Sequence, residues 1–342
     1  MAYKHGVYTS EVATSMVAPI TGTAGLQVIV GTAPVNMLKD PAAAVNVPLL
    51  VNSYKEAVEA VGYLPDFANY TLCECISANF SVVGIAPMVL INVLDPAKHK
   101  VAITGGTVQV NDGVAVLEET GVLLEGLTVK SGSNTLTAGT DYTTTWNDNG
   151  TLNIVVLSTG AGKEATSLTV TGNKIDPSKV TAADIVGGVD SSTGKETGLE
   201  VVRQVYPKLS MTPGILLAPR FSKDATVAAA LQAKTKSINS VFGAVCVVDI
   251  DCSNTGATKY TAVKTTKEAQ AVSDPNAYAV WPFAKVGNTV YSGSALAAAL
   301  TAYTDAQNND TPNVSPSRPS PFLPPASKMA RRWCLIRSRP TP

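Results

Sequence analysis

The stretch from Val7 to Val35 limits what this chain can fold into more than any other part of it. Its first half, Tyr8 to Thr23, is rich in Ser, Thr, Ala and Pro and has too few large apolar residues to fold on itself. Its second half contains the β-branched run Leu26–Gly31, which predicts a buried strand. An extended arm leading into a core strand can satisfy its unpaired N–H and C=O groups by adding to the sheet edge of a neighbouring subunit. A frayed N-terminus is the alternative interpretation.

Length and composition bound the class of protein. A chain of 342 residues predicts two or three domains. Apolar residues make up 45% of it and charged residues 15%, below the roughly 25% charged of an average soluble protein. The surface is therefore expected to be largely uncharged, which suits a protein that packs against other protein chains. A formal net charge of zero gives no global field for nucleic acid or an anionic membrane, so we expect neither as a partner.

Targeting signals and a cysteine framework are not visible in the sequence. No apolar run approaches the roughly 18 residues needed to cross a bilayer, and the N-terminus lacks the pattern of a signal peptide. The five cysteines form no CxxC pair. Cys73 and Cys75 lie two apart on an expected helix, where their side chains diverge and are poorly placed to share a metal. We expect reduced, buried thiols in a cytosolic product.

The segment after the arm predicts alternating helices and strands. Ser53 to Glu56 forms a capping box that opens a helix ending at Val61, and Gly62 stops it. Pro65 to Phe80 carries apolar residues at helical spacing and predicts a second helix. Gly84 to Asp95 is a nearly continuous apolar run, so we expect a strand in the middle of a sheet with both faces covered.

Composition changes at about Val101. From there to about Val170 short Val/Thr/Leu runs are separated by Gly, Asn, Asp and Ser turn signals, which predicts an all-β sandwich or barrel. Its strongest hairpin signal is Asn149–Gly150, between the runs Tyr142–Trp146 and Leu152–Leu157. A small helix starting at Thr181 and a linker over residues 187–197 follow.

Helices and strands alternate again to residue 307. We expect helices at 199–209, at 222–238 capped by the segment Ser222–Asp224, at 265–272 and at 294–307 capped by Ser294. We expect strands at 215–218, within 241–250 and at 278–283. Connections of this length imply parallel pairing. The expected fold class is thus mixed α+β and α/β: an extended N-terminal arm (1–22), a discontinuous α/β core domain from both ends of the chain (23–95 plus 196–312), and an inserted all-β sandwich or barrel domain (96–195).

No catalytic, cofactor-binding or metal-binding residue can be assigned from motifs. The run Ser158–Lys163 looks like a phosphate loop, but Leu157 stands where glycine is required and Glu164 where Ser or Thr is required. It is therefore interpreted as a turn. The two histidines, His5 and His99, have no recognisable nucleophile partner.

Asp249 and Asp251 follow a core strand, where open α/β sheets often bind ligands. Two carboxylates without a His or Glu cluster make a weak metal site, and capping of the next loop is the simpler interpretation. No cofactor is expected.

Several segments taken together resemble the tail sheath proteins of contractile phage tails and tail-like particles. No single motif is diagnostic, but their order from residue 3 to about 317 is specific. The segments are Tyr3–Tyr8, Ser10–Glu11, Pro19, Gly31–Pro34, Pro87–Pro96, Gly139–Tyr142 with Asn149–Gly150, Pro213–Pro219, Tyr278–Phe283, and the Ser294 helix leading to Pro312–Ser317.

The resemblance implies a structural subunit and not an enzyme. Copies would stack as sixfold rings around a tail tube, with the inserted β domain outside and contraction driven by a metastable lattice instead of a nucleotide. Further partners would be the tail tube, baseplate and tail terminator proteins, in a virion tail or tail-like particle assembled in the bacterial cytoplasm. The terminal arms would exchange strands between neighbours, with arm residues Tyr8, Val12 and Val17 pairing with another subunit.

The sequence departs from this pattern at Arg318. Residues 318–342 contain six basic residues, no acidic residue and no periodicity, which is either a disordered basic tail or an out-of-frame translation. Codons can be chosen for Pro319 to Thr341 so that the frame starting at the third base of Pro319 reads VPISATCLKDGTEVVLDPEQAN, a more protein-like string that also resembles how sheath proteins continue. The six basic residues are Arg318, Lys328, Arg331, Arg332, Arg337 and Arg339.

Two other classes of function remain as alternatives. One is an α/β enzyme with an appended β-sandwich, perhaps carbohydrate-directed through Asp249 and Asp251. The other is a monomeric adhesion or binding module built on the β unit.

Overall fold

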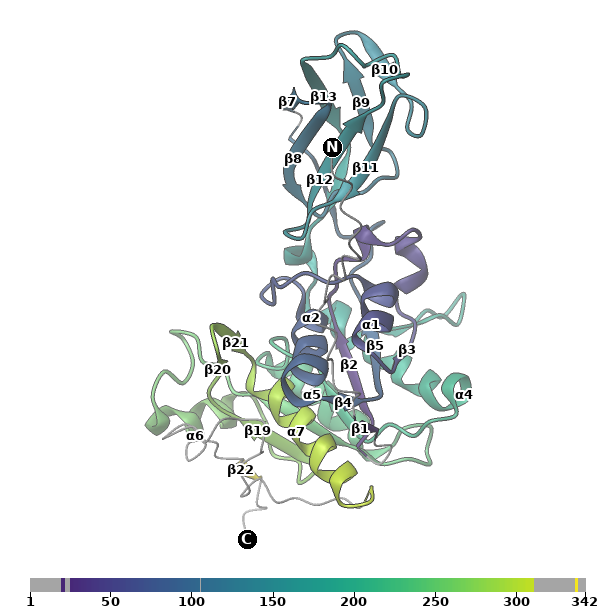
Figure 1. Ribbon diagram of the computed structural model, residues 1–342. Helices are drawn as coiled ribbons and strands as arrows, with labels where there is room; N and C mark the ends of the chain where they lie inside the picture. The colour runs from purple at the N-terminus through teal and green to yellow at the C-terminus, as the bar shows by residue number, and fades with distance from the viewer. Residues whose placement is uncertain (1–19, 22–24, 105, 311–335, 338–342) are drawn as a thin grey trace, which may run out of the picture.

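The protein has a mixed α/β fold with several sheets, two of them seven-stranded (Figure 1). The computed structural model describes residues 20–21, 25–104, 106–310 and 336–337. The mixed class expected from the sequence is confirmed. No helix in the described part of the chain is long and apolar enough to cross a membrane.

The central seven-stranded sheet has the order β22-β19-β18-β17-β2-β5-β3. Five neighbouring strands are parallel, as the strand–helix alternation predicts, and two antiparallel strands flank them. All of β2 and β5 is buried, because helices cover both faces of the sheet. The strands are β2 (Gln27–Gly31), β3 (Leu49–Val51), β5 (Met88–Asn92), β17 (Ile215–Leu217), β18 (Val245–Asp249), β19 (Ala277–Val280) and β22 (Ile336–Arg337).

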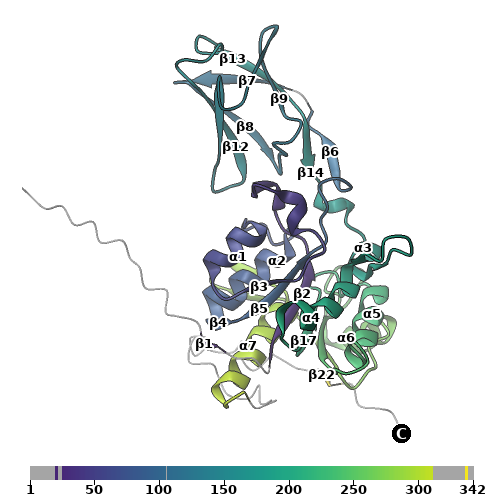
Figure 2. The same ribbon diagram turned by 90° about the vertical axis from the view of Figure 1, so that its right-hand side faces the viewer.

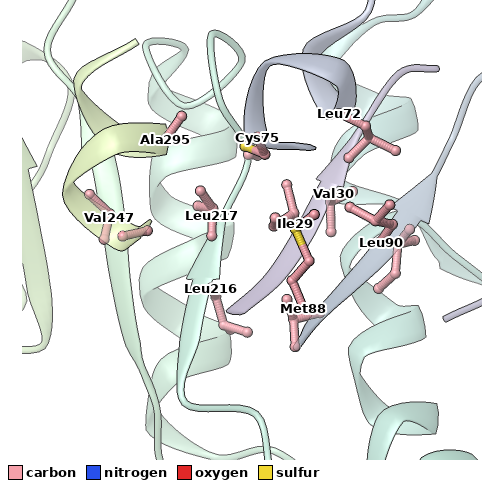
Figure 3. Packing of buried hydrophobic residues seen from close by; sticks show 14 of the residues in the cluster. Ile29, Val30, Leu72, Cys75, Met88, Leu90, Leu216, Leu217, Val247 and Ala295 are labelled. Carbon is pink, nitrogen blue, oxygen red and sulfur yellow. The ribbon is translucent and has the colours of Figure 1, made fainter. Parts of the chain in front are cut away.

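Two groups of helices pack on the central sheet. Helix α2 and helix α7 pack on β2 and on each other, and α5 packs on β17 and β18. Figure 3 shows Leu72 and Cys75 of α2 and Ala295 of α7 beside the apolar side chains of the strands. The helices are α1 (Tyr54–Val61), α2 (Thr71–Ile76) continued by a π-helical segment (Ser77–Val83), α3 (Ala182–Val186), α4 (Val205–Leu209), α5 (Ala225–Lys236), α6 (Tyr260–Ala269) and α7 (Gly293–Gln307), with 3₁₀ turns at Val35–Met37, Pro41–Ala44, Pro177–Lys179 and Gly198–Gln204.

The second predicted helix begins later than expected. The sequence predicts it from Pro65, but α2 begins at Thr71. The Asp66 carboxylate accepts hydrogen bonds from the backbone and side-chain N–H groups of Asn69, and this closes a local turn before the helix. The helix can start only after that turn.

Other boundaries shift for local reasons. The strand predicted over Gly84–Asp95 is divided into β4 (Ile85–Ala86) and β5, because Pro87 has no N–H for a sheet ladder. Within the predicted capping segment 222–224, Asp224 caps α5. Helix α7 is capped by Ser292, whereas the sequence predicts Ser294. Helix α6 also begins earlier than the predicted 265, and the predicted linker 187–197 contains a hairpin of β15 (Gly188–Val189) and β16 (Glu196–Thr197).

Residues 106–171 form the second seven-stranded sheet, which is antiparallel with the order β10-β9-β13-β7-β8-β12-β11. The predicted hairpin across Asn149–Gly150 is confirmed as the β11–β12 pair. Strand β7 pairs with β13 at one end and with β8 at the other, so the sheet bends around a core of its own. The strands are β7 (Gly106–Asn111), β8 (Val114–Thr120), β9 (Thr128–Ser131), β10 (Asn134–Leu136), β11 (Tyr142–Trp146), β12 (Thr151–Val156) and β13 (Ser167–Thr171).

A narrow connection joins this sheet to the rest of the molecule. Strands β6 (Lys100–Ala102) and β14 (Asn173–Ile175) pair as an antiparallel ribbon below it (Figure 2). Gly150, at φ 82°, packs against the side chain of Leu64, and a Cβ there would lie 2.7 Å from a Leu64 methyl group. The short strands β1 (Ile20–Thr21), β20 (Ala284–Val286) and β21 (Thr289–Tyr291) complete the described elements.

The separate hydrophobic cores lead to a prediction about cooperativity. Ile154 lies in the core of the bent sheet and Leu216 in that of the central sheet, and both are fully buried. We expect either substitution, Ile154→Ala or Leu216→Ala, to lower the free energy of unfolding by about 2–5 kcal/mol. Hydrogen exchange followed by mass spectrometry should show each variant losing protection mainly in its own sheet. Equal losses in both sheets from either variant would contradict two separate cores.

Candidate functional site at the carboxyl edge of the central sheet

The carboxyl ends of β2 and β17 are where a ligand site would be expected in this sheet. The chain passes from β2 to β5 on one side, whereas β17, β18 and β19 extend the sheet on the other side. Such a reversal of strand order opens a crevice at the carboxyl ends of the two central strands, and open α/β sheets commonly bind ligands there.

Side chains of the protein itself fill this position. Glu74 of α2 is fully buried and accepts two hydrogen bonds from Arg220, which follows β17. The distances are 2.9 Å from Nε and 3.1 Å from Nη2 of the guanidinium to the two carboxylate oxygens. The backbone N–H of Ser292 also donates to the Glu74 carboxylate. The guanidinium lies 5.3 Å from the centre of the Phe283 ring and donates to the Val290 carbonyl oxygen.

Asp249, at the end of β18, is held in a second buried network. Its carboxylate accepts hydrogen bonds from the backbone N–H and hydroxyl of Ser294, at 2.7 and 2.6 Å, and from the backbone N–H of Arg220 at 3.2 Å. Arg220 reaches this position with a left-handed backbone, φ 65°. Asp249 therefore holds the first turn of α7 against the sheet, where the helix dipole also favours a negative charge.

Burial dominates the electrostatics of both carboxyl groups. Removal from water raises the pKa of Glu74, and the hydrogen bonds and charge of Arg220 oppose this effect. Burial likewise raises the pKa of Asp249, opposed by its hydrogen bonds from Ser294. Each carboxylate therefore depends on its donors to stay ionised at neutral pH.

The remaining space beside the network is a cavity of about 210 Å³. Asp251, at its rim, accepts hydrogen bonds from the backbone N–H and the hydroxyl of Ser253, so it caps the following loop as the sequence predicts. Asp249 and Asp251 thus have structural partners, and the described residues contain no group of three or more His, Cys, Asp or Glu that could hold a metal ion. The lining residues are Arg220, Lys223, Asp249, Ile250, Asp251, Cys252, Ser253 and Phe283.

Two other sequence candidates have ordinary structural roles. Residues 158–164 form turns, as expected from the failed phosphate-loop pattern. His99 is buried, and its Nδ1 accepts a hydrogen bond from the backbone N–H of Asp95. His5 lies outside the described residues.

The predicted inter-subunit residues Tyr8, Val12 and Val17 also lie outside the described residues. Within the described part, Ile20–Thr21 pairs in parallel with Ile85–Ala86, and Ile336–Arg337 pairs antiparallel with Tyr278–Ala279. A segment near each end of the chain therefore adds to the edge of a strand. Backbone groups at β4 and β19 are the groups that accept these additions.

Sequence reasoning did not identify the Glu74–Arg220 pair. One signal was present: Glu74 is the only charged residue between Asp66 and Asp95, in an otherwise uncharged helix-and-strand segment. A lone carboxylate there requires a buried partner. The partner could not be deduced, because Arg220 is 146 residues away in sequence.

Comparisons with known proteins give one clear relative. A scan against protein-family models found no match. Among curated proteins, a tail sheath protein of Burkholderia phage BcepMu is 30% identical to this chain over 241 residues. The alignment covers 70% of this chain and 48% of the phage protein, so the chain spans about half the length of the relative it matches.

The Glu74–Arg220 pair gives a pH-dependent prediction. Replacing Arg220 by Met leaves a buried carboxylate without its cation, and we expect unfolding free energy to fall by about 3–5 kcal/mol at about pH 8. The pKa of Glu74 is raised in the folded state, so the folded protein takes up a proton before the unfolded chain does. The loss should therefore shrink as the pH is lowered toward about 5.5. Urea unfolding of the variant and the unsubstituted chain at both pH values measures this loss of unfolding free energy.

Arg203→Met is the matched control. The Arg203 side chain is 47% exposed and lies 3.5 Å from Glu196, so its removal should cost less than about 1 kcal/mol. Equal costs for the two variants, or a cost at Arg220 that is independent of pH, would contradict the assigned role of the pair.

Proposed function

This chain belongs to the tail sheath protein family, and on that premise we propose that it is a structural subunit of a contractile tail sheath. The similarity to the phage tail sheath protein is the observation that carries the proposal. The carboxyl edge of the central sheet supports a non-enzymatic role, because Glu74, Arg220 and Asp249 hold one another and α7 there. The same contacts weaken the alternative of an enzyme acting through Asp249 and Asp251.

We infer a discontinuous core with an inserted domain as the domain organisation of the subunit. Residues 23–95 and 196–312 would form the α/β core, residues 96–195 the inserted β domain, and residues 1–22 the arm. Strands from before the β unit (β2, β3 and β5) and from after it (β17, β18 and β19) join in one central sheet, which favours this division. The separate apolar core of the β unit and its narrow β6–β14 connection also favour it.

Assembly would proceed by strand addition between copies. Strand β4 accepts the short segment Ile20–Thr21 that follows the arm, which supports its use as a docking edge. The arm, through Tyr8, Val12 and Val17, would reach such an edge in a neighbouring copy. Rings of six copies would then stack around a tail tube and remain linked while the lattice shortens and widens.

The partners and location follow from this role. The sheath would contact the tail tube, baseplate and tail terminator proteins in a virion tail or tail-like particle assembled in the host cytoplasm. Contraction would draw on the metastable lattice, with no nucleotide or other cofactor.

For residues 318–342 we propose a change of reading frame. In favour are the six basic residues without an acidic one and the protein-like string in the alternative frame. Codons at the end of the gene that are incompatible with that string would refute this proposal. If it holds, the form with the alternative end should assemble more readily than the present chain.

Self-assembly is tested by electron microscopy of the purified chain beside a version with the alternative C-terminus. We expect rings or tubes from at least one of them. Replacing Tyr8, Val12 and Val17 together by Asp should abolish these particles without changing the melting temperature of the dispersed subunit, because the proposed contacts of the arm are made between copies. Dispersed monomers from both unsubstituted forms at high concentration would refute the sheath function.

A further inference from the structure

The two ends of the central sheet carry surfaces of opposite charge. Helix α1 packs on the edge strand β3 at one end, and α6 lies beside β19 at the other. Both views show α1 and α6 on opposite sides of the sheet (Figures 1 and 2). Each end also exposes aromatic side chains.

The surface at the α6 end is basic. We define it by exposed Lys259 and Lys264 at the start of α6, exposed Lys285 of β20, and Tyr260, which is 67% exposed and packs 6.4 Å from Trp281 between ring centres. Lys259 and Lys285 have no ion-pair partner among the described residues. Lys264 has only the weak surface pair with Glu268, at 3.9 Å. Most of the positive charge here is thus unneutralised.

The surface at the α1 end is acidic. We define it by exposed Asp40, Glu56, Glu59 and Asp66, which outnumber exposed Lys39 and Lys55, and by the half-buried pair Tyr54 and Tyr63, whose rings meet edge to face at 5.2 Å. Glu59 has the weak surface pair with Lys55, at 3.8 Å. Asp40, Glu56 and Asp66 accept hydrogen bonds from neutral N–H groups and, within the described residues, have no cation within ion-pair distance. Hydrogen bonds from neutral groups leave the negative charge in place. The hydrogen bonds that Asn52 donates to Glu56 keep the pKa of its carboxyl below the ordinary value, so the carboxylate is ionised at neutral pH.

These two surfaces provide the two different patches that a head-to-tail interface requires. Head-to-tail association closes into a ring when the rotation between copies closes, and otherwise continues as a filament. Surfaces at opposite ends of one sheet leave each copy able to contact two neighbours. Tyrosines with flanking charges are also typical of protein interfaces, since aromatic rings provide contact area and charges provide orientation.

We propose that the basic α6 surface of one copy binds the acidic α1 surface of a second copy, so that subunits associate head to tail. The inference rests on the proposed self-assembly and specifies the surfaces that meet within it. Tyr260 would pack near the Tyr54–Tyr63 pair, and the lysines would face Glu56 and Glu59. The association should weaken as salt is added, because these charges are exposed.

A charge-reversal experiment on the full chain tests the pairing. One variant carries Lys259→Glu and Lys285→Glu, and the other carries Glu56→Lys and Glu59→Lys. Either variant alone would place like charges opposite each other at the interface. We therefore expect the concentration for half-maximal association to rise roughly tenfold or more, measured by sedimentation velocity at low salt. An equimolar mixture should recover association, because each variant then complements both ends of the other.

The control reverses two exposed lysines of the β unit, Lys130→Glu and Lys163→Glu, and should associate like the unsubstituted chain. Thermal melts verify that every variant is folded, and Tyr260→Ser, which keeps all charges, tests the surface by a second route with the same expected weakening. If the unsubstituted chain associates but both charge variants and Tyr260→Ser associate equally well, the head-to-tail pairing is wrong and self-assembly stands. If neither the unsubstituted chain nor the form with the alternative C-terminus associates under any condition, both the pairing and self-assembly are wrong.

Discussion

The arrangement of the central sheet and its covering helices depends on one desolvated carboxylate, Glu74. It lies in an uncharged helix facing the sheet and is held by the guanidinium of Arg220 and by the backbone of Ser292. A buried ion pair of this kind adds little stability compared with well-packed apolar groups, but loss of one partner is costly. Its effect is therefore positional: α2, the loop after β17 and the start of α7 can adopt only the arrangement that pairs both charges. Asp249 reinforces the same junction through Ser294.

That junction stands at the position where open α/β sheets commonly bind ligands. The crevice at the carboxyl ends of β2 and β17 contains the buried Glu74–Arg220 ion pair, where other sheets of this kind bind a ligand. Short terminal segments pair with β4 and β19, and the exposed charges of the acidic and basic surfaces lie at α1 and α6. A subunit that assembles as proposed would use these peripheral elements.

Local patterns predicted the fold where local chemistry decides it. The N-cap at Ser53, the hairpin at Asn149–Gly150 and the parallel strands followed from spacing and turn residues. The second half of the predicted capping box is not formed, because the Glu56 carboxylate accepts from Asn52. The start of α2 was wrong, because the side-chain turn of Asp66 with Asn69 overrides helical periodicity. The cap of α7 was also wrong, since Ser294 bonds to the buried Asp249 instead. The Glu74–Arg220 pair joins residues that are distant in sequence, and only tertiary structure brings them together.

The central claim is that copies of this chain join by adding terminal segments to one another's sheet edges. The most direct measurement is chemical cross-linking in a mixture of nitrogen-isotope-labelled and unlabelled chains carrying Ile20→Cys and Ile85→Cys, positions that pair in register. If terminal segments exchange between copies, cross-linked peptides should combine labelled and unlabelled segments under conditions where particles form. Cross-links joining only segments of the same isotope at every concentration would show that the arm stays on its own chain and would contradict the account.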